Sequence, residues 1–129
     1  MKYFVVDGHC TEHIRLAQML SKLYKQLQLI ETDGERLYAL YQRRIDLLGP
    51  LLSDINPSVY YNFVQEMQVE FQEIYGELYD LKYKDIESGK VKKTKKRLAE
   101  LNDCLRKSIA NGKLVTEALM KYEEKFDYL

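Results

Sequence analysis

Five carboxylates recur at helical spacing in the middle of the chain and form its most regular set of chemically active side chains. They are Glu66, Glu70, Glu73, Glu77 and Asp80, which advance by four, three, four and three positions. On a helix this spacing places them along one edge. General acid and base catalysis needs carboxyl groups whose environments push their pKa values apart, and a uniform row does not by itself create that difference. We therefore interpret the row as a solvated helix face or, functionally, as a protein-binding strip for a basic partner.

A metal site is the next chemistry to consider, because His9, Cys10 and His13 lie close together with Asp7 nearby. Histidines four positions apart can share a helix face. These are the only two histidines, however, and no second ligand pair occurs in the sequence. Capping and partial exposure explain them, so we expect no metal and no cofactor. The sequence also lacks a GxSxG motif, a glycine-rich phosphate loop and a cysteine with an obvious histidine base, so we predict neither an enzyme nor a small-molecule substrate.

A second charge cluster is basic and follows the carboxylate row. Six cations occupy eight positions: Lys90, Lys92, Lys93, Lys95, Lys96 and Arg97. Such a run is typical of a solubilising helix start, and the alternative is contact with an acidic partner such as RNA, anionic lipid or the acidic tails of tubulin. No aromatic side chain is interleaved within the run, which disfavours nucleic acid.

Composition places the chain among ordinary globular proteins of the cytoplasm. Twenty basic residues balance twenty acidic ones, so no bulk charge pulls the whole molecule onto nucleic acid or an anionic membrane. Cys10 and Cys104 stand far apart, without metal-finger spacing, and are expected to be free thiols in a reducing compartment. No run approaches the roughly 20 apolar residues that a membrane-spanning helix needs. We therefore expect no export signal and no membrane insertion.

The elements that carry these side chains are predicted to be helices throughout. Apolar residues recur at intervals of three and four, and no strand pattern is present. The strongest repeat is the stripe that we expect to form the core of the third helix: Phe63, Met67, Phe71, Ile74 and Leu78. Turn and cap signals, including a capping box at Thr32 to Glu35, Gly49-Pro50, Asn56-Pro57, Ser88-Gly89 and Asn111-Gly112, separate the helices. The predicted helices span about residues 11–31, 33–49, 57–87, 91–110 and 113–128.

These helices predict one all-α domain over residues 1–129, made of antiparallel helix pairs in a bundle or an α-solenoid. The first helix has a wide apolar set: Ile14, Leu16, Ala17, Leu20, Leu23, Tyr24, Leu27 and Ile30. The last helix carries Val115, Leu119, Tyr122 and Phe126, and no later element follows to cover them. We therefore expect this helix to need a partner, and self-association is one way to supply it.

Several uncommon strings occur together in one order and resemble a known family. They are Tyr3-Phe4-Val5-Val6-Asp7-Gly8, Glu31-Thr32-Asp33-Gly34-Glu35-Arg36, Arg43-Arg44-Ile45-Asp46-Leu47-Leu48-Gly49-Pro50-Leu51, Asp54-Ile55-Asn56-Pro57, Tyr60-Tyr61, Gln68-Val69-Glu70-Phe71 and Tyr79-Asp80-Leu81-Lys82. In these strings, over residues 3 to 85, the chain resembles the C-terminal half of the KIF-binding protein family. Ala118-Leu119-Met120-Lys121-Tyr122 resembles a further helix of that family. The likeness fades between Ser88 and Lys113, and the chain resembles a fragment or a short, divergent member.

The resemblance implies a tetratricopeptide-like α-solenoid that binds the motor domains of kinesins and keeps them off microtubules. It implies a cytoplasmic, cytoskeleton-associated adaptor in microtubule-based transport, with no enzymatic activity. The alternative that we retain is a structural helical module, which completes a larger solenoid or self-associates without binding a motor directly. An acidic contact should weaken in salt, whereas apolar self-association should strengthen.

Overall fold

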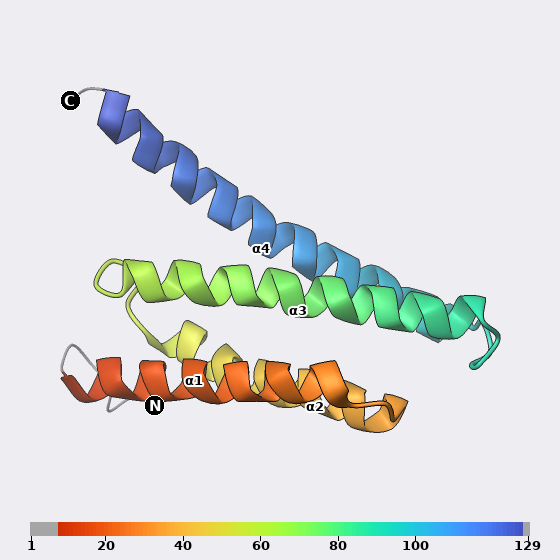
Figure 1. The fold of residues 1–129 in the computed structure, drawn as a ribbon. Coiled ribbons are helices and arrows are strands. Elements are labelled where there is room, and N and C mark those ends of the chain that lie inside the picture. The colour runs from red at the N-terminus through yellow and green to blue at the C-terminus, as the bar shows by residue number, and fades with distance from the viewer. Residues whose placement is uncertain (1–7, 128–129) are drawn as a thin grey trace. The chain divides into compact units, whose positions relative to one another are not determined.

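A computed structural model describes residues 8–127 of the chain, and side chains for residues 11–121. This part of the chain contains four α-helices and no strand: α1 (Gly8–Ile30), α2 (Gly34–Asp54), α3 (Tyr61–Glu87) and α4 (Lys95–Asp127) (Figure 1). The predicted all-α class is confirmed for these residues. The chain divides into two compact units, Met1–Met67 and Gln68–Leu129, so that α3 begins in the first unit and continues in the second. A single domain over residues 1–129 stays a prediction.

The first unit is built on a hairpin of α1 and α2, which run side by side in opposite directions (Figure 1). The N-terminus of α2 lacks the side-chain capping that the sequence predicts. Asp33, not Thr32, is the N-cap, with an extended backbone and no side-chain cap hydrogen bond. Its carbonyl accepts from the amide of Leu37 at 3.0 Å, and its own amide donates to Oε1 of Glu31 at 3.0 Å. The predicted capping box therefore does not form, because with Asp33 as the N-cap the third helical residue is Arg36, which has no acceptor to offer the N-cap amide.

A fully buried arginine decides which face of α1 packs inward. Arg44 of α2 has 0% of its surface exposed, and its Nε donates to Oγ of Ser21 at 3.2 Å. One of its terminal nitrogens donates to Oε1 of Gln28 at 2.9 Å. Removing a guanidinium from water costs several kcal/mol unless its donors find acceptors. Ser21 and Gln28 supply two acceptors from α1, and this orients the Gln28 amide so that its Nε2 is buried with no acceptor among the described residues.

The apolar core of this unit is drawn from α1, α2, the connection after α2 and the start of α3. Its buried members are Ile14, Ala17, Tyr41, Leu48, Leu51, Ile55, Tyr60 and Met67. Only Ile14 and Ala17 come from the wide apolar set predicted for the first helix, and the leucines of that set are exposed. The set identifies the helix correctly but not its buried face, because the inward face also carries Ser21 and Gln28.

α2 continues through Gly49-Pro50 to Asp54, so the predicted end at residue 49 is wrong. Proline removes one amide donor and crowds the residue before it, but glycine has no Cβ to meet the proline ring. Nothing lies within 4 Å of the Cβ position of Gly49. Burial of Leu48 and Leu51, 0% and 2% exposed, holds the final turns in helical form.

The next connection is a turn and not the start of a helix. Oδ1 of Asn56 accepts from the amide of Ser58 at 2.9 Å, and the Asn56 carbonyl accepts from the amides of Val59 and Tyr60. α3 then begins at Tyr61, four residues later than the predicted start at residue 57. Asn56 therefore caps a short turn of its own.

α3 ends at Glu87, and the Ser88-Gly89 pair follows it. Gly89 has a φ of 76°, a left-handed conformation that glycine adopts without strain, and its amide donates to the carbonyl of Ile86 at 3.2 Å. α4 begins at Lys95, later than the predicted residue 91, because Oγ1 of Thr94 accepts from the amide of Arg97 at 3.2 Å and caps the helix there. The first three lysines of the basic run thus precede α4, and its last three cations form the first turn.

α4 runs without a break to Asp127, so the predicted stop at Asn111-Gly112 is wrong. Gly112 has no positive φ and is not a helix terminus. A Cβ at Gly112 would lie 2.7 Å from Nε2 of Gln72, so this glycine permits a close approach to α3. The core of the second unit comprises Phe71, Ile74, Leu78, Leu101 and Cys104. In the stripe predicted for the third helix, Met67, Phe71, Ile74 and Leu78 are buried, whereas Phe63 is half-buried.

Replacing Arg44 by alanine should destabilise the first unit. The change deprives the buried oxygens of Ser21 and Gln28 of a donor and leaves a cavity, so we expect the free energy of unfolding to fall by about 3 kcal/mol. Urea denaturation followed by circular dichroism measures it. The control is Arg36→Ala, whose side chain is 75% exposed, and it should change stability by no more than about 0.5 kcal/mol. Equal effects of the two substitutions would show that the buried arginine does not hold α1 to α2.

Replacing Pro50 by alanine should have the opposite sign. Proline inside a helix costs about 3 kcal/mol, and it returns about 0.4 to 1 kcal/mol by restricting the unfolded chain. We expect Pro50→Ala to raise the free energy of unfolding by about 2 kcal/mol, measured in the same denaturation experiment. Ser53→Ala, at an exposed position of the same helix, is the matched control and should shift stability by only about 0.5 kcal/mol. A loss of stability in Pro50→Ala would contradict this account of α2.

Candidate protein-binding surface

The five predicted carboxylates all lie on α3, which is uninterrupted from Tyr61 to Glu87. Glu66 and Asp80 are exposed, and Glu70, Glu73 and Glu77 are half-buried. Glu66 belongs to the first unit, where its Oε2 accepts from Nε2 of Gln18 at 2.8 Å. None of the five residues is buried, and their spacing keeps them along one edge of the helix. We call these five residues the acidic row.

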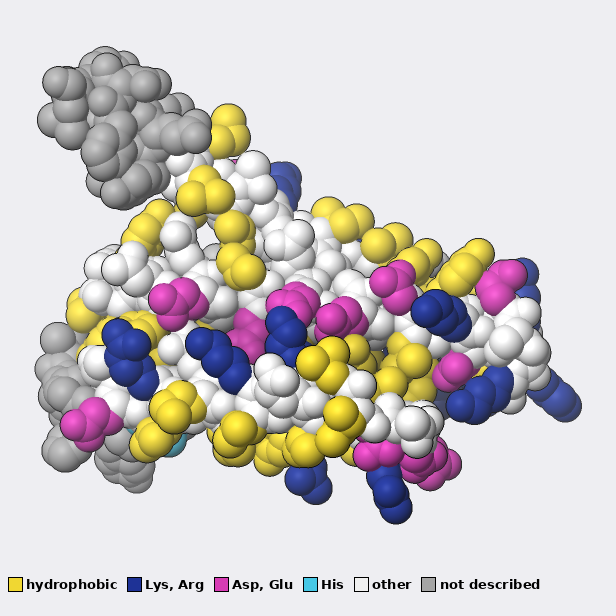
Figure 2. All heavy atoms as spheres, in the orientation of Figure 1, with side chains coloured by type: hydrophobic (Ala, Val, Ile, Leu, Met, Phe, Trp, Pro, Cys, Tyr) yellow, Lys and Arg dark blue, Asp and Glu magenta, His cyan; other side chains and the backbone are white. Residues whose placement is uncertain are grey.

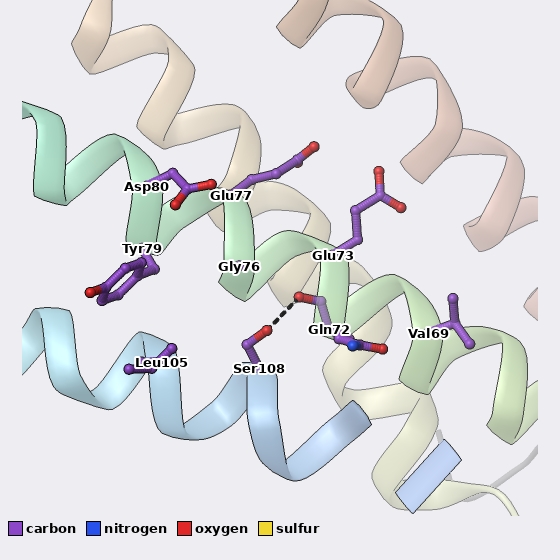
Figure 3. Close-up of a pocket in the computed structure, with 9 residues that line it drawn as sticks. All are labelled: Val69, Gln72, Glu73, Gly76, Glu77, Tyr79, Asp80, Leu105 and Ser108. Carbon is purple, nitrogen blue, oxygen red and sulfur yellow. Dashed lines mark hydrogen bonds between the residues drawn. The ribbon is translucent and has the colours of Figure 1, made fainter. Parts of the chain in front are cut away.

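An open groove of about 640 Å³ lies beside the acidic row in the second unit. Its lining combines three members of the row with apolar and small residues from α3 and α4 (Figure 3): Val69, Gln72, Glu73, Gly76, Glu77, Tyr79, Asp80, Leu105 and Ser108. Figure 3 shows Glu73, Glu77 and Asp80 on one side of α3, with Leu105 and Ser108 of α4 on the other. The groove is therefore lined by carboxylates from α3 and by Leu105 and Ser108 from α4.

α3 and α4 approach each other closely at two small residues that line the groove, Gly76 and Ser108. A Cβ at Gly76 would lie 3.3 Å from Oγ of Ser108, closer than most such contacts. The Ser108 hydroxyl donates to the backbone carbonyl of Gln72 at 2.9 Å (Figure 3). Hydroxyl-to-carbonyl bonds of this kind hold helices together where side chains are too small to do so. Gly76 and Ser108 thus set how closely α3 and α4 approach.

Apolar surface is exposed within the groove. Val69 is 47% exposed and Leu105 is 38% exposed. Carboxylates beside accessible apolar side chains suit a protein partner that offers both cations and an apolar anchor, because charge steers association and apolar burial supplies affinity.

Other ionisable groups of the second unit have structural explanations. A hydrogen bond with Asp103, 3.0 Å away, raises the pKa of Lys107, whose ammonium also lies 5.3 Å from the ring centre of Tyr75. Burial raises the pKa of the Cys104 thiol, which keeps it protonated. A nucleophilic cysteine needs a lowered pKa. Cys104 is therefore not an activated nucleophile.

The predicted metal-type cluster is only partly described. The side chains of Asp7, His9 and Cys10 lie outside the described residues, and His13 is half-buried on α1. Among the described side chains, no group of three potential metal ligands comes together. Within residues 8–127, no helix is both long enough and apolar enough to cross a membrane.

Comparison with known proteins identifies the family. A family model described as "KIF-1 binding protein C terminal" matches residues 1–126. The chain belongs to the KIF-binding protein family. Its relatives include proteins named KIF-binding protein from Danio rerio and Homo sapiens, 41% and 40% identical over 81 residues, which is 63% of this chain. This membership confirms the resemblance seen in the sequence.

The family extends to distant organisms and to much longer proteins. The KIF-binding protein of Dictyostelium discoideum is 27% identical over 77 residues. The matched segment is 13% of the Danio rerio and Homo sapiens proteins, so the chain spans only a small part of these relatives' length. No solved structure matches the chain.

The sequence predicted the acidic row but not the groove beside it. Gly76, Ser108 and Leu105 were not recognised as site residues, because their role depends on how α4 crosses α3. One signal was available: Gly76 stands alone inside a strong helical pattern, and such glycines often mark close packing. Gly112 carries the same signal, and its pairing with Asn111 led instead to a predicted helix end.

Enlarging Gly76 should push α4 away from α3. Gly76→Val adds a Cβ that would lie 3.3 Å from Ser108 Oγ and two further methyl groups, so we expect a loss of about 1 to 3 kcal/mol despite the better helix propensity. Urea denaturation measures the change. Ala110→Val, at an exposed position of α4, is the matched control and should alter stability by about 0.5 kcal/mol at most. If Gly76→Val were as stable as this control, the crossing would not depend on a small residue.

Proposed function

We propose that this chain is a protein-binding adaptor segment that binds the motor domain of a kinesin and thereby regulates its attachment to microtubules and its transport. The observation that carries the proposal is the acidic row beside an open, partly apolar groove, on one unbroken helix of a chain that belongs to the KIF-binding protein family. Relatives bearing the name KIF-binding protein support this choice of partner.

The proposed contact is electrostatic at its edge. The resemblance to the family implies a kinesin motor that binds microtubules through a lysine-rich surface. The acidic row would present carboxylates to that surface, from Glu66, Glu70, Glu73, Glu77 and Asp80. Each exposed ion pair contributes only about 0.2 to 1 kcal/mol. A row of them mainly accelerates association and makes binding sensitive to salt. Val69 and Leu105 would supply the apolar contact that holds the complex.

The same proposal includes the architecture and the location. We propose that antiparallel helix pairs, α1 with α2 and α3 with α4, are units of a tetratricopeptide-like α-solenoid. A solenoid exposes a long surface made from successive helices, which suits recognition of another protein. A motor-binding adaptor would work in the cytoplasm, in association with the cytoskeleton.

Reversing the charge of the groove tests this function. The triple variant Glu73→Lys, Glu77→Lys and Asp80→Lys should weaken binding to purified kinesin motor domains by about tenfold or more at low salt, because attraction becomes repulsion. Biolayer interferometry at low and high salt measures this, and added microtubules should compete with the chain for the motor. The matched control reverses three exposed carboxylates outside the row, Asp54, Glu87 and Glu117, and should retain binding.

Two results would contradict the proposal. Unchanged motor binding by the triple variant, with its helicity intact, would exclude the acidic row as the contact. Failure of the unmodified chain to bind any motor would favour the alternative, a structural module that completes a larger solenoid or self-associates. Exposed Leu119 and Met120 on α4 favour that alternative, and association through them would strengthen in salt.

A further inference from the structure

The connection from α3 to α4 carries an exposed threonine within the basic run. Residues 92–94 have no regular secondary structure, and Thr94 directly precedes the first residue of α4 (Figure 1). Thr94 is exposed, and so are the two lysines on each side of it: Lys92, Lys93, Lys95 and Lys96. Figure 2 shows basic side chains at the end of α3 and α4 where this connection lies, at the right of the view. The threonine therefore stands at the surface, with cations before and after it in the sequence.

All the charge close to Thr94 in the sequence is positive. Five of the six residues within three positions of it are lysine or arginine, and the sixth is Val91. The nearest carboxylates in the sequence are Glu87 and Glu100, seven and six positions away. Glu100 lies 3.8 Å from the ammonium of Lys82 on α3. A segment this rich in one charge suits recognition by a protein that reads basic sequence.

The backbone around Thr94 suits the active site of a protein kinase. Kinases choose among hydroxyls partly by the charges that flank them, and a kinase with an acidic substrate groove favours lysine and arginine around the acceptor. The acceptor must also lie in a segment that can enter the active site. Residues 92–94 already lie outside a helix, and the amides at the start of α4 have no acceptors within that helix. Only the first turn of α4 therefore has to open.

Two other hydroxyls near cations lack one of these properties. Ser108 follows two cations on α4, but it is half-buried, and its hydroxyl donates to the backbone carbonyl of Gln72 at 2.9 Å. Ser88 is exposed, but Asp85 and Glu87 lie within three positions of it, and its hydroxyl donates to the Asp85 carbonyl at 3.4 Å. Neither serine combines an exposed position with cations on both sides.

We propose that Thr94 is a phosphorylation site for a serine/threonine protein kinase that recognises basic sequence, with ATP as the phosphoryl donor. Oγ1 of Thr94 forms a bond to the γ-phosphorus of ATP, and the bond from that phosphorus to the oxygen bridging to the β-phosphate breaks. ADP leaves, and the hydroxyl proton passes to the catalytic aspartate of the kinase. The product is a phosphothreonine that carries about −1.5 to −2 charges at neutral pH, in the middle of six cations.

A phosphate on Thr94 also strengthens the start of α4. Oγ1 of Thr94 accepts from the amide of Arg97 at 3.2 Å and caps the helix. The first turn contains three cations, which oppose the helix dipole, so a negative charge there offsets an unfavourable arrangement. A guanidinium nitrogen of Arg97 donates to the Lys92 carbonyl at 2.8 Å, and a phosphate oxygen is a stronger acceptor for it. Phosphorylation should therefore stabilise α4.

Labelling of the full chain tests the assignment. The chain is incubated with ATP and the catalytic fragment of protein kinase C, a kinase that prefers cations on both sides of its acceptor, and mass spectrometry locates the phosphate. We expect labelling at Thr94. Thr94→Asn keeps a good N-cap but has no hydroxyl to phosphorylate, so it should lower labelling about tenfold or more with helicity unchanged. Lys92→Gln with Lys96→Gln, one change on each side, should lower the labelling rate about tenfold.

Thr32→Ala is the matched control for the labelling experiment. Thr32 is exposed and lies outside a helix, as Thr94 does, but Glu31 and Asp33 flank it. Its loss should therefore leave labelling unchanged. Labelling mainly at another hydroxyl would overturn the assignment. So would labelling that survives Thr94→Asn or the double lysine change.

Thermal unfolding followed by circular dichroism tests the effect on α4. The phosphorylated chain should unfold about 3 °C higher than the unphosphorylated chain at low salt, because the phosphate adds a favourable charge at the helix start. The difference should shrink in high salt. An equal or lower unfolding temperature would overturn the stabilisation of α4. Labelling and unfolding are both measured without a motor protein, so neither result depends on the proposed kinesin contact.

Discussion

The hydrogen-bonded burial of Arg44 is the constraint from which the first unit follows. A guanidinium with no exposed surface must have acceptors close by, and Ser21 and Gln28 of α1 provide them. These two residues can reach α2 only if their side of α1 faces inward. The same rotation turns Leu16, Leu20, Leu23 and Leu27 outward, so the polar contact in the core and these exposed leucines lie on opposite sides of α1.

This constraint explains where sequence periodicity succeeds and where it stops. The repeat of apolar residues predicts α1 correctly, because any helix with that spacing has an apolar side. The repeat does not predict which side of the helix is buried when polar residues on its other side accept hydrogen bonds from a buried charged side chain of another helix. In α3, Met67, Phe71, Ile74 and Leu78 are buried as predicted, and Phe63 of the same stripe is half-buried. The apolar repeat predicts the buried face of a helix correctly where apolar packing alone decides that face.

Helix boundaries and the groove show a second physical limit of local signals. Gly49-Pro50 and Asn111-Gly112 both indicate helix ends, yet α2 and α4 pass through them. At the first site, buried neighbours hold the helix despite a missing donor. At the second, glycine provides space for Gln72 of α3. The acidic row was predictable from spacing alone, whereas the groove depends on Gly76 meeting Ser108 across a crossing that no local pattern specifies.

A net charge of zero conceals this distribution of charge. Carboxylates recur along α3, whereas α1 exposes six apolar side chains: Leu16, Met19, Leu20, Leu23, Leu27 and Ile30. The two surfaces also differ in composition. The acidic row has two exposed apolar side chains beside it, Val69 and Leu105, so binding there should combine a dependence on charge and salt with an apolar contact. On α1 the exposed side chains are apolar, so apolar burial would dominate the free energy of any contact there. The buried arginine leaves the leucines of α1 exposed, so the two surfaces differ in whether charge or apolar burial would contribute most to a contact.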